Sequence, residues 1–113
     1  MIEQGEIWWA DLGEPIGSEP GYWRPALIVQ SAKFNKSGIN TVVVVVITGQ
    51  LRWAESPGNV RLSASTTGLD RESVANVSQM FTVDRRSLGE RIGKVSERKL
   101  GQVLDGIELL IGR

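Results

Sequence analysis

The sequence NTVVVVVITGQ, residues 40–50, contains five consecutive valines followed by isoleucine and is the strongest indication of the fold in this chain. β-Branched side chains suit the pleated surface of a sheet and crowd the turns of a helix. A run that is apolar at nearly every position predicts a strand that is covered on both faces. We therefore expect this segment to be the central strand of a sheet.

Shorter strand-like segments lie on both sides of the valine run. Residues 5–12 alternate with period two, which predicts a half-buried first strand with Ile7 and Trp9 on one face. Residues 25–30 predict a second strand. Weaker strand patterns follow at residues 60–63, 72–77, 79–84 and 90–95. Because little helix separates these segments, the sequence predicts a mainly β fold, either a small antiparallel barrel or a strongly bent sheet.

Two segments are predicted to be helical, and two to be long loops. Ser31 is a candidate N-cap for a helical turn over residues 32–36, and Ser96 for a C-terminal helix whose apolar residues recur on one face. Gly101 and Gly106 each weaken that helix by roughly 1 kcal/mol relative to alanine, so we expect it to pack against the sheet. The glycine- and proline-containing loops are residues 13–23 and 49–59.

The chain of 113 residues contains no cysteine and no histidine. This composition excludes disulfides, thiolate nucleophiles, imidazole acids or bases and most zinc sites. We expect no metal ion and no cofactor. Any catalysis would then depend largely on charge stabilisation by the remaining polar residues.

Size and hydropathy predict one domain over residues 1–113. No apolar run approaches the roughly 20 residues of a membrane helix, and the acidic N-terminus does not resemble a signal peptide, so we expect a cytoplasmic protein without a membrane segment. The formal net charge is zero. Residues 85–99 nevertheless contain six arginines or lysines, which can support a local anion-binding face.

Arg24 and Thr48 are the candidate catalytic residues. Arg24 stands between Trp23 and Pro25 at the start of the second strand, where a fixed guanidinium suits two-point recognition of a phosphate. Alternatively, Arg24 caps the loop or pairs with Glu19. Thr48 ends the valine strand, although threonine is also an ordinary strand residue. If the second and third strands are neighbours, both residues lie at one sheet edge.

Four segments in register resemble the MazF/PemK family of toxin endoribonucleases. They are the G-[ED]-I-W start, the G-S-E-x-G-x-x-R-P loop ending at Arg24, the I-T-x-Q strand end with Thr48, and Q-x-x-T-[VI]-D-x-R-x-L from Gln79 to Leu88. The resemblance covers nearly the whole chain. It implies an SH3-like small barrel of the MazF/PemK/CcdB type with a C-terminal helix.

The resemblance also implies an activity and partners. The family acts as a homodimer, cuts single-stranded RNA without a metal ion and is held by an antitoxin, here a MazE-like one. Its catalytic arginine and threonine correspond to Arg24 and Thr48. Candidate RNA-binding residues are Trp23, Gln50, Arg52, Trp53, Gln79 and Arg86.

This chain departs from many relatives at Tyr22 and Trp23, where they carry small residues, and at Phe81, where several carry a basic one. These changes bear on the RNA sequence preference. Trp53 either stacks on a base or folds back on the barrel. Trp8 and Trp9 are assigned to the core or a dimer contact.

The expected reaction is attack of the ribose 2′-hydroxyl on the adjacent phosphorus, leaving a 2′,3′-cyclic phosphate. Arg24 would stabilise the charge that develops on phosphorus-bound oxygens, and Thr48 would donate a hydrogen bond to one of them. Two alternatives stay open from the sequence. One is a non-catalytic toxin of the same fold that poisons DNA gyrase, and the other is a plain RNA-binding module.

Overall fold

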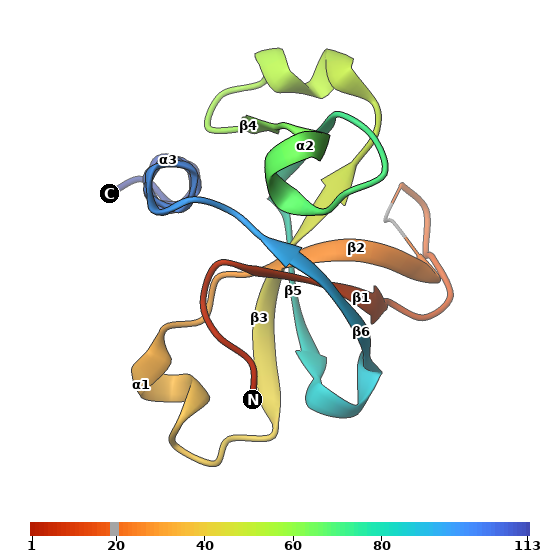
Figure 1. Cartoon of the computed structure of the whole chain (residues 1–113), viewed down its shortest axis with the longest axis vertical. Coiled ribbons are helices and arrows are strands. Elements are labelled where there is room, and N and C mark those ends of the chain that lie inside the picture. The colour runs from red at the N-terminus through yellow and green to blue at the C-terminus, as the bar shows by residue number, and fades with distance from the viewer. Residues whose placement is uncertain (19–20) are drawn as a thin grey trace.

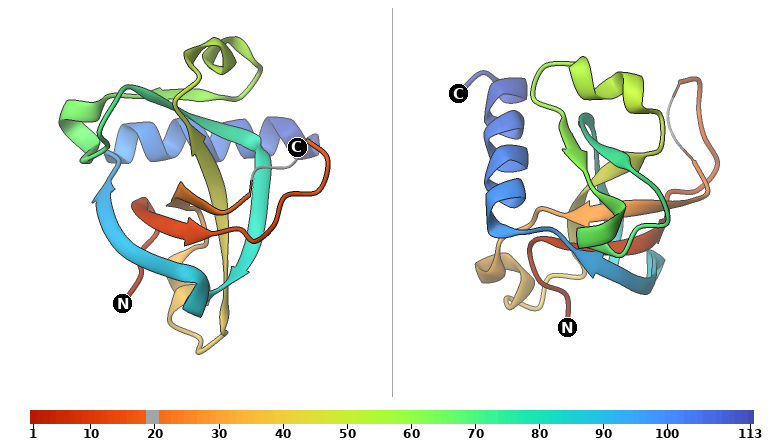
Figure 2. Two further views of the ribbon diagram at one scale, coloured as in Figure 1. Left: turned by 90° about the vertical axis from the view of Figure 1, so that its right-hand side faces the viewer. Right: turned by 45° about the horizontal axis from the view of Figure 1, so that its top comes forward.

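The computed structural model describes residues 1–18 and 21–113. Six strands form one antiparallel sheet in the order β4-β5-β3-β2-β1-β6 (Figure 1). Their bounds are β1 Glu6–Asp11, β2 Trp23–Ile28, β3 Thr41–Thr48, β4 Val60–Leu62, β5 Ser73–Asp84 and β6 Leu88–Lys94. The predicted mainly β fold is confirmed, and the sheet is curled into a half-barrel (Figure 2).

Strand β3 is buried on both faces of the sheet, as the valine run predicted. Its odd-numbered side chains, including Val45 and Ile47, belong to one hydrophobic cluster, while Val42 and Val44 belong to a second cluster on the other face. All four side chains are at most 2% exposed. Burial of apolar surface on both faces therefore fixes this strand at the centre of the structure.

The C-terminal helix α3 (Glu97–Ile111) covers the first of these clusters by packing against β4 and β5. Ser96 is its N-cap and accepts a hydrogen bond from the Lys99 amide at 3.1 Å, as its position before the apolar repeat predicted. The right-hand view of Figure 2 shows α3 on the side of the molecule opposite the β1–β2 loop. The helix thus leaves that loop side of the sheet uncovered.

Shorter helical turns occupy the connections. They are α1 (Ala32–Asn35), α2 (Ala64–Thr67) and the 3₁₀ turns η1 (Leu51–Glu55) and η2 (Arg85–Ser87). The sequence pattern predicted α1 but not α2. A distant carboxylate stabilises α2, because Glu72 accepts from the Ala64 amide at 2.6 Å, and Gly68 ends the turn in the left-handed region.

Two glycines allow a close backbone contact between α2 and the edge strand β6. A side chain at Gly93 of β6 would overlap the carbonyl group of Thr67, and one at Gly68 would meet the backbone of Ile92. These two glycines let α2 lie directly against β6. In the part that the structure describes, β4 and β6 are the two edges of the sheet and form no hydrogen-bonded ladder with each other.

The prediction of separate strands at residues 72–77 and 79–84 is wrong, because β5 is continuous. Val45 of β3 pairs with Met80, but the next residue, Val46, pairs with Asn76. Residues 77–79 therefore form a bulge in β5. Bulges re-aim side chains next to functional sites, and this one lies beside the end of β3.

Trp9 does not lie in the core with Ile7, as the alternation predicted. Ile7 is fully buried, whereas Trp9 is 41% exposed. Trp9 and Trp23 both lie against Gly89 of β6. Among the described residues, no helix is long and apolar enough to span a membrane.

Candidate functional site

Arg24 and Thr48 lie at the same edge of the sheet because β2 and β3 are antiparallel neighbours. Ala26 pairs with Val46, and extending that register by two residues places Arg24 opposite Thr48. Side chains opposite each other in an antiparallel pair share one face. The sheet thus brings the two predicted catalytic residues together.

A cleft of about 280 Å³ forms around this pair. Its walls come from the end of β3, the β1–β2 loop, the loop after β3 and the bulge of β5. The lining residues are Ser18, Arg24, Val46, Ile47, Thr48, Gln50, Arg52, Trp53, Asn76 and Gln79. The cleft therefore contains six of the eight residues that the sequence indicated.

Arg24 is held by the loop that precedes it. Its Nε donates to the Gly21 carbonyl at 3.3 Å, and Tyr22, with φ of 59°, directs the chain into β2 in a conformation uncommon for residues other than glycine. No described carboxylate lies within 4.0 Å of Arg24. The alternative pairing with Glu19 falls outside the described residues. The guanidinium thus presents positive charge to the cleft.

Thr48 is oriented by the turn that follows it. Its Oγ1 accepts from the Gln50 amide at 3.2 Å, which leaves the hydroxyl proton available to donate. Gly49 makes room for an arginine at this turn, because an added Cβ would lie 2.9 Å from Cδ of Arg71. A second cationic side chain therefore lies against the backbone next to Thr48.

The loop after β3 contributes an aromatic wall. The Arg52 guanidinium lies 5.3 Å from the ring centroid of Trp53, a cation–π arrangement, and Trp53 is 40% exposed. Asn59 pins this loop by donating to the Trp53 carbonyl at 2.9 Å and accepting from the Val77 amide at 2.9 Å. The backbone at Trp53 is thus fixed, and its partly exposed ring can stack on a base.

Sequence reasoning missed Asn76 and Ser18 as lining residues. Asn76 lies in β5, where asparagine is uncommon because its side chain competes for backbone hydrogen bonds. A polar residue in the apolar pattern of residues 74–77 was the available signal. Its position opposite Val46 depends on the bulge, which no periodicity predicted.

Residues 3–111 match the family described as "PemK-like, MazF-like toxin of type II toxin-antitoxin system". This chain belongs to that family. It is 41% identical to endoribonuclease MazF2 of Mycobacterium bovis over 98% of this chain and 97% of the relative, and 35% identical to endoribonuclease MazF of Staphylococcus saprophyticus over 99% and 92%.

A solved structure of an endoribonuclease in complex with its cognate antitoxin, from a mycobacterial species, superposes with a TM-score of 0.80. It is 23% identical and the match covers 99% of this toxin and 96% of that chain. This likeness confirms the predicted toxin fold.

Trp23 and Arg86 lie outside the cleft of the toxin. Trp23 lies over Gly89 on β6 and is 53% exposed. Arg86 follows the far end of β5, where Asp84 pairs with Thr41 at the start of β3, and its Nε donates to Asp84 at 3.0 Å. That hydrogen bond lowers the pKa of Asp84 and raises the pKa of Arg86.

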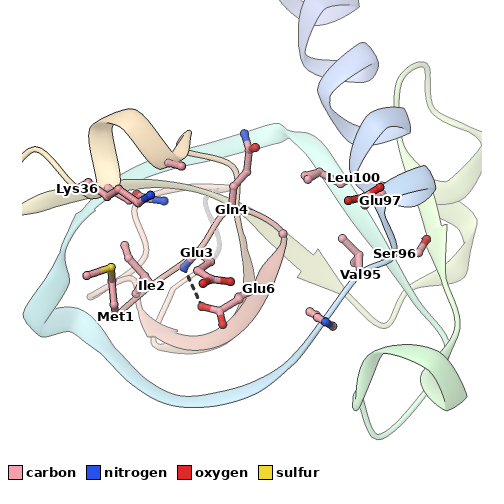
Figure 3. A pocket seen from close by; sticks show the side chains of 14 residues that line it. Met1, Ile2, Glu3, Gln4, Glu6, Lys36, Val95, Ser96, Glu97 and Leu100 are labelled. Atoms are coloured by element: carbon pink, nitrogen blue, oxygen red, sulfur yellow. Dashed lines mark hydrogen bonds between the residues drawn. The ribbon is translucent and has the colours of Figure 1, made fainter.

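A larger hollow of about 530 Å³ lies between the N-terminal segment of the toxin and the start of α3 (Figure 3). Acidic Glu3, Glu6 and Glu97 and basic Lys36 and Lys94 line it. It therefore lacks the concentrated positive charge of the Arg24 cleft. Among residues 1–18 and 21–113, no group of three or more carboxylates is arranged to hold a metal ion.

Proposed function

We propose that this chain is an endoribonuclease that cleaves single-stranded RNA in the cleft between Arg24 and Thr48. Two supports are independent of each other. Relatives at 41% and 35% identity are named endoribonucleases. The register of β2 and β3 places a cation and a hydroxyl donor on one face, which is the single observation that carries the proposal.

The proposed chemistry uses the nucleophile that RNA itself carries. The ribose 2′-oxygen attacks phosphorus and loses its proton, the bond from phosphorus to the 5′-oxygen breaks, and the leaving oxygen takes up a proton. The products are a 2′,3′-cyclic phosphate and a 5′-hydroxyl. Arg24 stabilises the negative charge of the phosphorane, and Thr48 donates to a non-bridging oxygen.

Single-stranded RNA is recognised largely through unstacked bases and through phosphates. Trp53 offers a ring for one base, Arg52 a cation for the backbone, and Gln50 and Gln79 offer amide groups to polar edges. Trp23 would contact the RNA outside the cleft. Arg86 lies at the opposite end of β3, so its proposed RNA contact would be made outside the cleft, by the same chain or by the second chain of a homodimer.

The proposal includes a biological setting, namely the toxin of a type II toxin–antitoxin pair, formed by one domain over residues 1–113 and acting as a cytoplasmic homodimer. A MazE-like antitoxin would inhibit it. The family description and the antitoxin complex of the solved mycobacterial endoribonuclease support this setting.

The test compares Arg24→Ala with Arg98→Ala, the same change at an exposed arginine on α3. Removing a preorganised donor from a charge-stabilising site costs about 10²- to 10³-fold in rate, so Arg24→Ala should be nearly inactive and Arg98→Ala should match the wild type. Cleavage of a mixed RNA is followed on denaturing gels. A folded Arg24→Ala variant that cuts at the wild-type rate would exclude the assigned role.

A second arm uses a strand with 2′-deoxyribose at the cleaved position. The wild type should bind it and leave it intact, because the nucleophile is absent. Binding without cleavage of any all-ribose strand would instead indicate a plain RNA-binding module. Inhibition of DNA gyrase by a protein that leaves RNA intact would indicate a gyrase poison.

A further inference from the structure

Asn76 is a buried polar residue in the floor of the cleft. The residue is 7% exposed and belongs to the lining of the cleft. In the β3–β5 ladder Thr48 pairs with Val74 and Val46 with Asn76, so Asn76 is the diagonal neighbour of Thr48 on the same face. Diagonal neighbours lie within about 7–8 Å of each other, close enough to contact the same ligand.

Neighbouring side chains fix the orientation of the Asn76 amide. The Val77 backbone amide donates to Asn59 Oδ1 at 2.9 Å, which turns Asn59 Nδ2 toward Asn76. That nitrogen donates to Asn76 Oδ1 at 3.2 Å, and the Ser78 hydroxyl donates to the same oxygen at 2.9 Å. The carbonyl side of Asn76 is therefore occupied.

The nitrogen side of Asn76 is different. Nδ2 carries two N–H donors, and within the described part of the chain neither has an acceptor. Nδ2 is not one of the buried unpaired atoms among the described residues, so it reaches the surface of the cleft, where its two donors can meet the acceptor of a bound ligand. The bulge at residues 77–79 sets the register in which Asn76 pairs with Val46 and lies diagonal to Thr48.

We propose that Asn76 is a third substrate-contacting residue, whose Nδ2 donates to an oxygen of the RNA at the cleaved step. This inference rests on the proposed function. Because Oδ1 is occupied, Asn76 cannot form the two-point amide contact that reads N6 and N7 of adenine. Nδ2 can still donate to a single acceptor, which we assign to either a non-bridging phosphate oxygen or a base carbonyl.

The test is Asn76→Asp, which keeps Oδ1 as the acceptor for Asn59 and Ser78 and replaces only the group that faces the cleft. We expect kcat/KM to fall by at least about 10²-fold. Binding of the strand with 2′-deoxyribose at the cleaved position should weaken as well. Asn40→Asp adds the same charge at an exposed position next to the start of β3 and should leave both readouts near the wild type.

Asn76→Ala serves as a second variant, because it removes the donor without adding charge. Thermal unfolding and circular dichroism are measured for both variants, so that a loss of folding is separated from a loss of contact. Supportive outcomes take two forms. If a phosphate oxygen is the acceptor, replacing that oxygen by sulfur should slow cleavage by the wild type more than cleavage by Asn76→Ala. If a base carbonyl is the acceptor, the loss of cleavage rate in Asn76→Ala should depend on which base is present.

One result overturns the inference while the proposed function stands. That result is a wild type that cleaves RNA together with a folded Asn76→Asp variant whose cleavage and binding stay within about 3-fold of it, far less than the loss of a preorganised donor. A wild type that neither cleaves nor binds RNA overturns the proposed function instead. The wild-type reaction therefore distinguishes the two failures.

Discussion

Glu6 offers a sharp test of how the first and last strands are held together. Its carboxylate is 12% exposed and accepts from three donors, namely the Glu3 amide at 2.8 Å, Trp8 Nε1 at 3.1 Å and Arg91 Nε at 2.8 Å. Figure 3 shows the bond from Glu3. Glu6→Gln keeps Oε1 for Glu3 and Trp8 and replaces Oε2, the partner of Arg91.

The magnitude follows from this geometry. A hydrogen bond to a charged group contributes about 1.5–3 kcal/mol. The Arg91 side chain is 44% exposed, and solvent screening places the pair at the lower end, about 1.5 kcal/mol. For a chain of this size, that loss lowers Tm by roughly 6 °C.

The effect depends on pH. Burial alone would raise the pKa of Glu6, but hydrogen bonds from Trp8, Glu3 and Arg91 outweigh it and hold the pKa below the ordinary 4.5. A carboxylate with a depressed folded pKa stabilises the fold fully above 4.5, and this contribution is lost as pH falls through the folded pKa. The wild type and Glu6→Gln should therefore converge at low pH.

Urea unfolding of the wild type and Glu6→Gln at about pH 7 and about pH 3 measures the difference in their stability. The urea midpoint reports stability as long as the m-value is unchanged. Glu90→Gln, at an exposed position of β6, is the matched control and should show no change at either pH. An equal loss of stability for Glu6→Gln at both pH values would show that the ionised carboxylate is not the stabilising group.

Two further predictions use matched pairs. Gly101→Ala should raise the free energy of unfolding by about 1 kcal/mol, because its Cβ would meet no atom within 4 Å. Gly106→Ala on the same helix should lower the free energy of unfolding by about 1–3 kcal/mol, because its Cβ would overlap the Gly58 backbone. Thermal melts that rank the two variants the other way would refute this packing. Trp53→Ala should weaken single-stranded RNA binding by about 5- to 150-fold in fluorescence anisotropy, and Phe34→Ala, at an exposed ring on α1, should not; equal binding by both variants would exclude stacking on Trp53.

Features set by local pattern were predictable from the sequence. The valine run had to be covered on both faces, and β3 lies between two hydrophobic clusters. The meeting of Arg24 and Thr48 needed only the assumption that consecutive strands pair antiparallel, which the β2–β3 register confirms. The helix from Ser96 followed from its cap and its apolar spacing.

Features set by distant contacts were not predictable. Helix α2 depends on Glu72, eight residues beyond the amide it binds, and Trp9 lies beside Gly89, a residue of a strand far along the chain. Asn76 lies in the cleft because β5 has a bulge in its pairing with β3. Such positions depend on tertiary pairing, and local propensity carries no information about them.

The five valines of β3 are identical, so a shift of β3 by two residues would still leave a valine at most of the positions that the native valines occupy. What distinguishes one alignment from another is found at the boundary, where Thr48 stands across from Val74 and the extra residues of β5 begin after Asn76. A molecule in which β3 pairs in the shifted register would thus retain a hydrophobic core and a normal circular dichroism spectrum but would lack the cleft around Arg24 and Thr48. Activity per folded molecule, rather than folded yield, would reveal such a population.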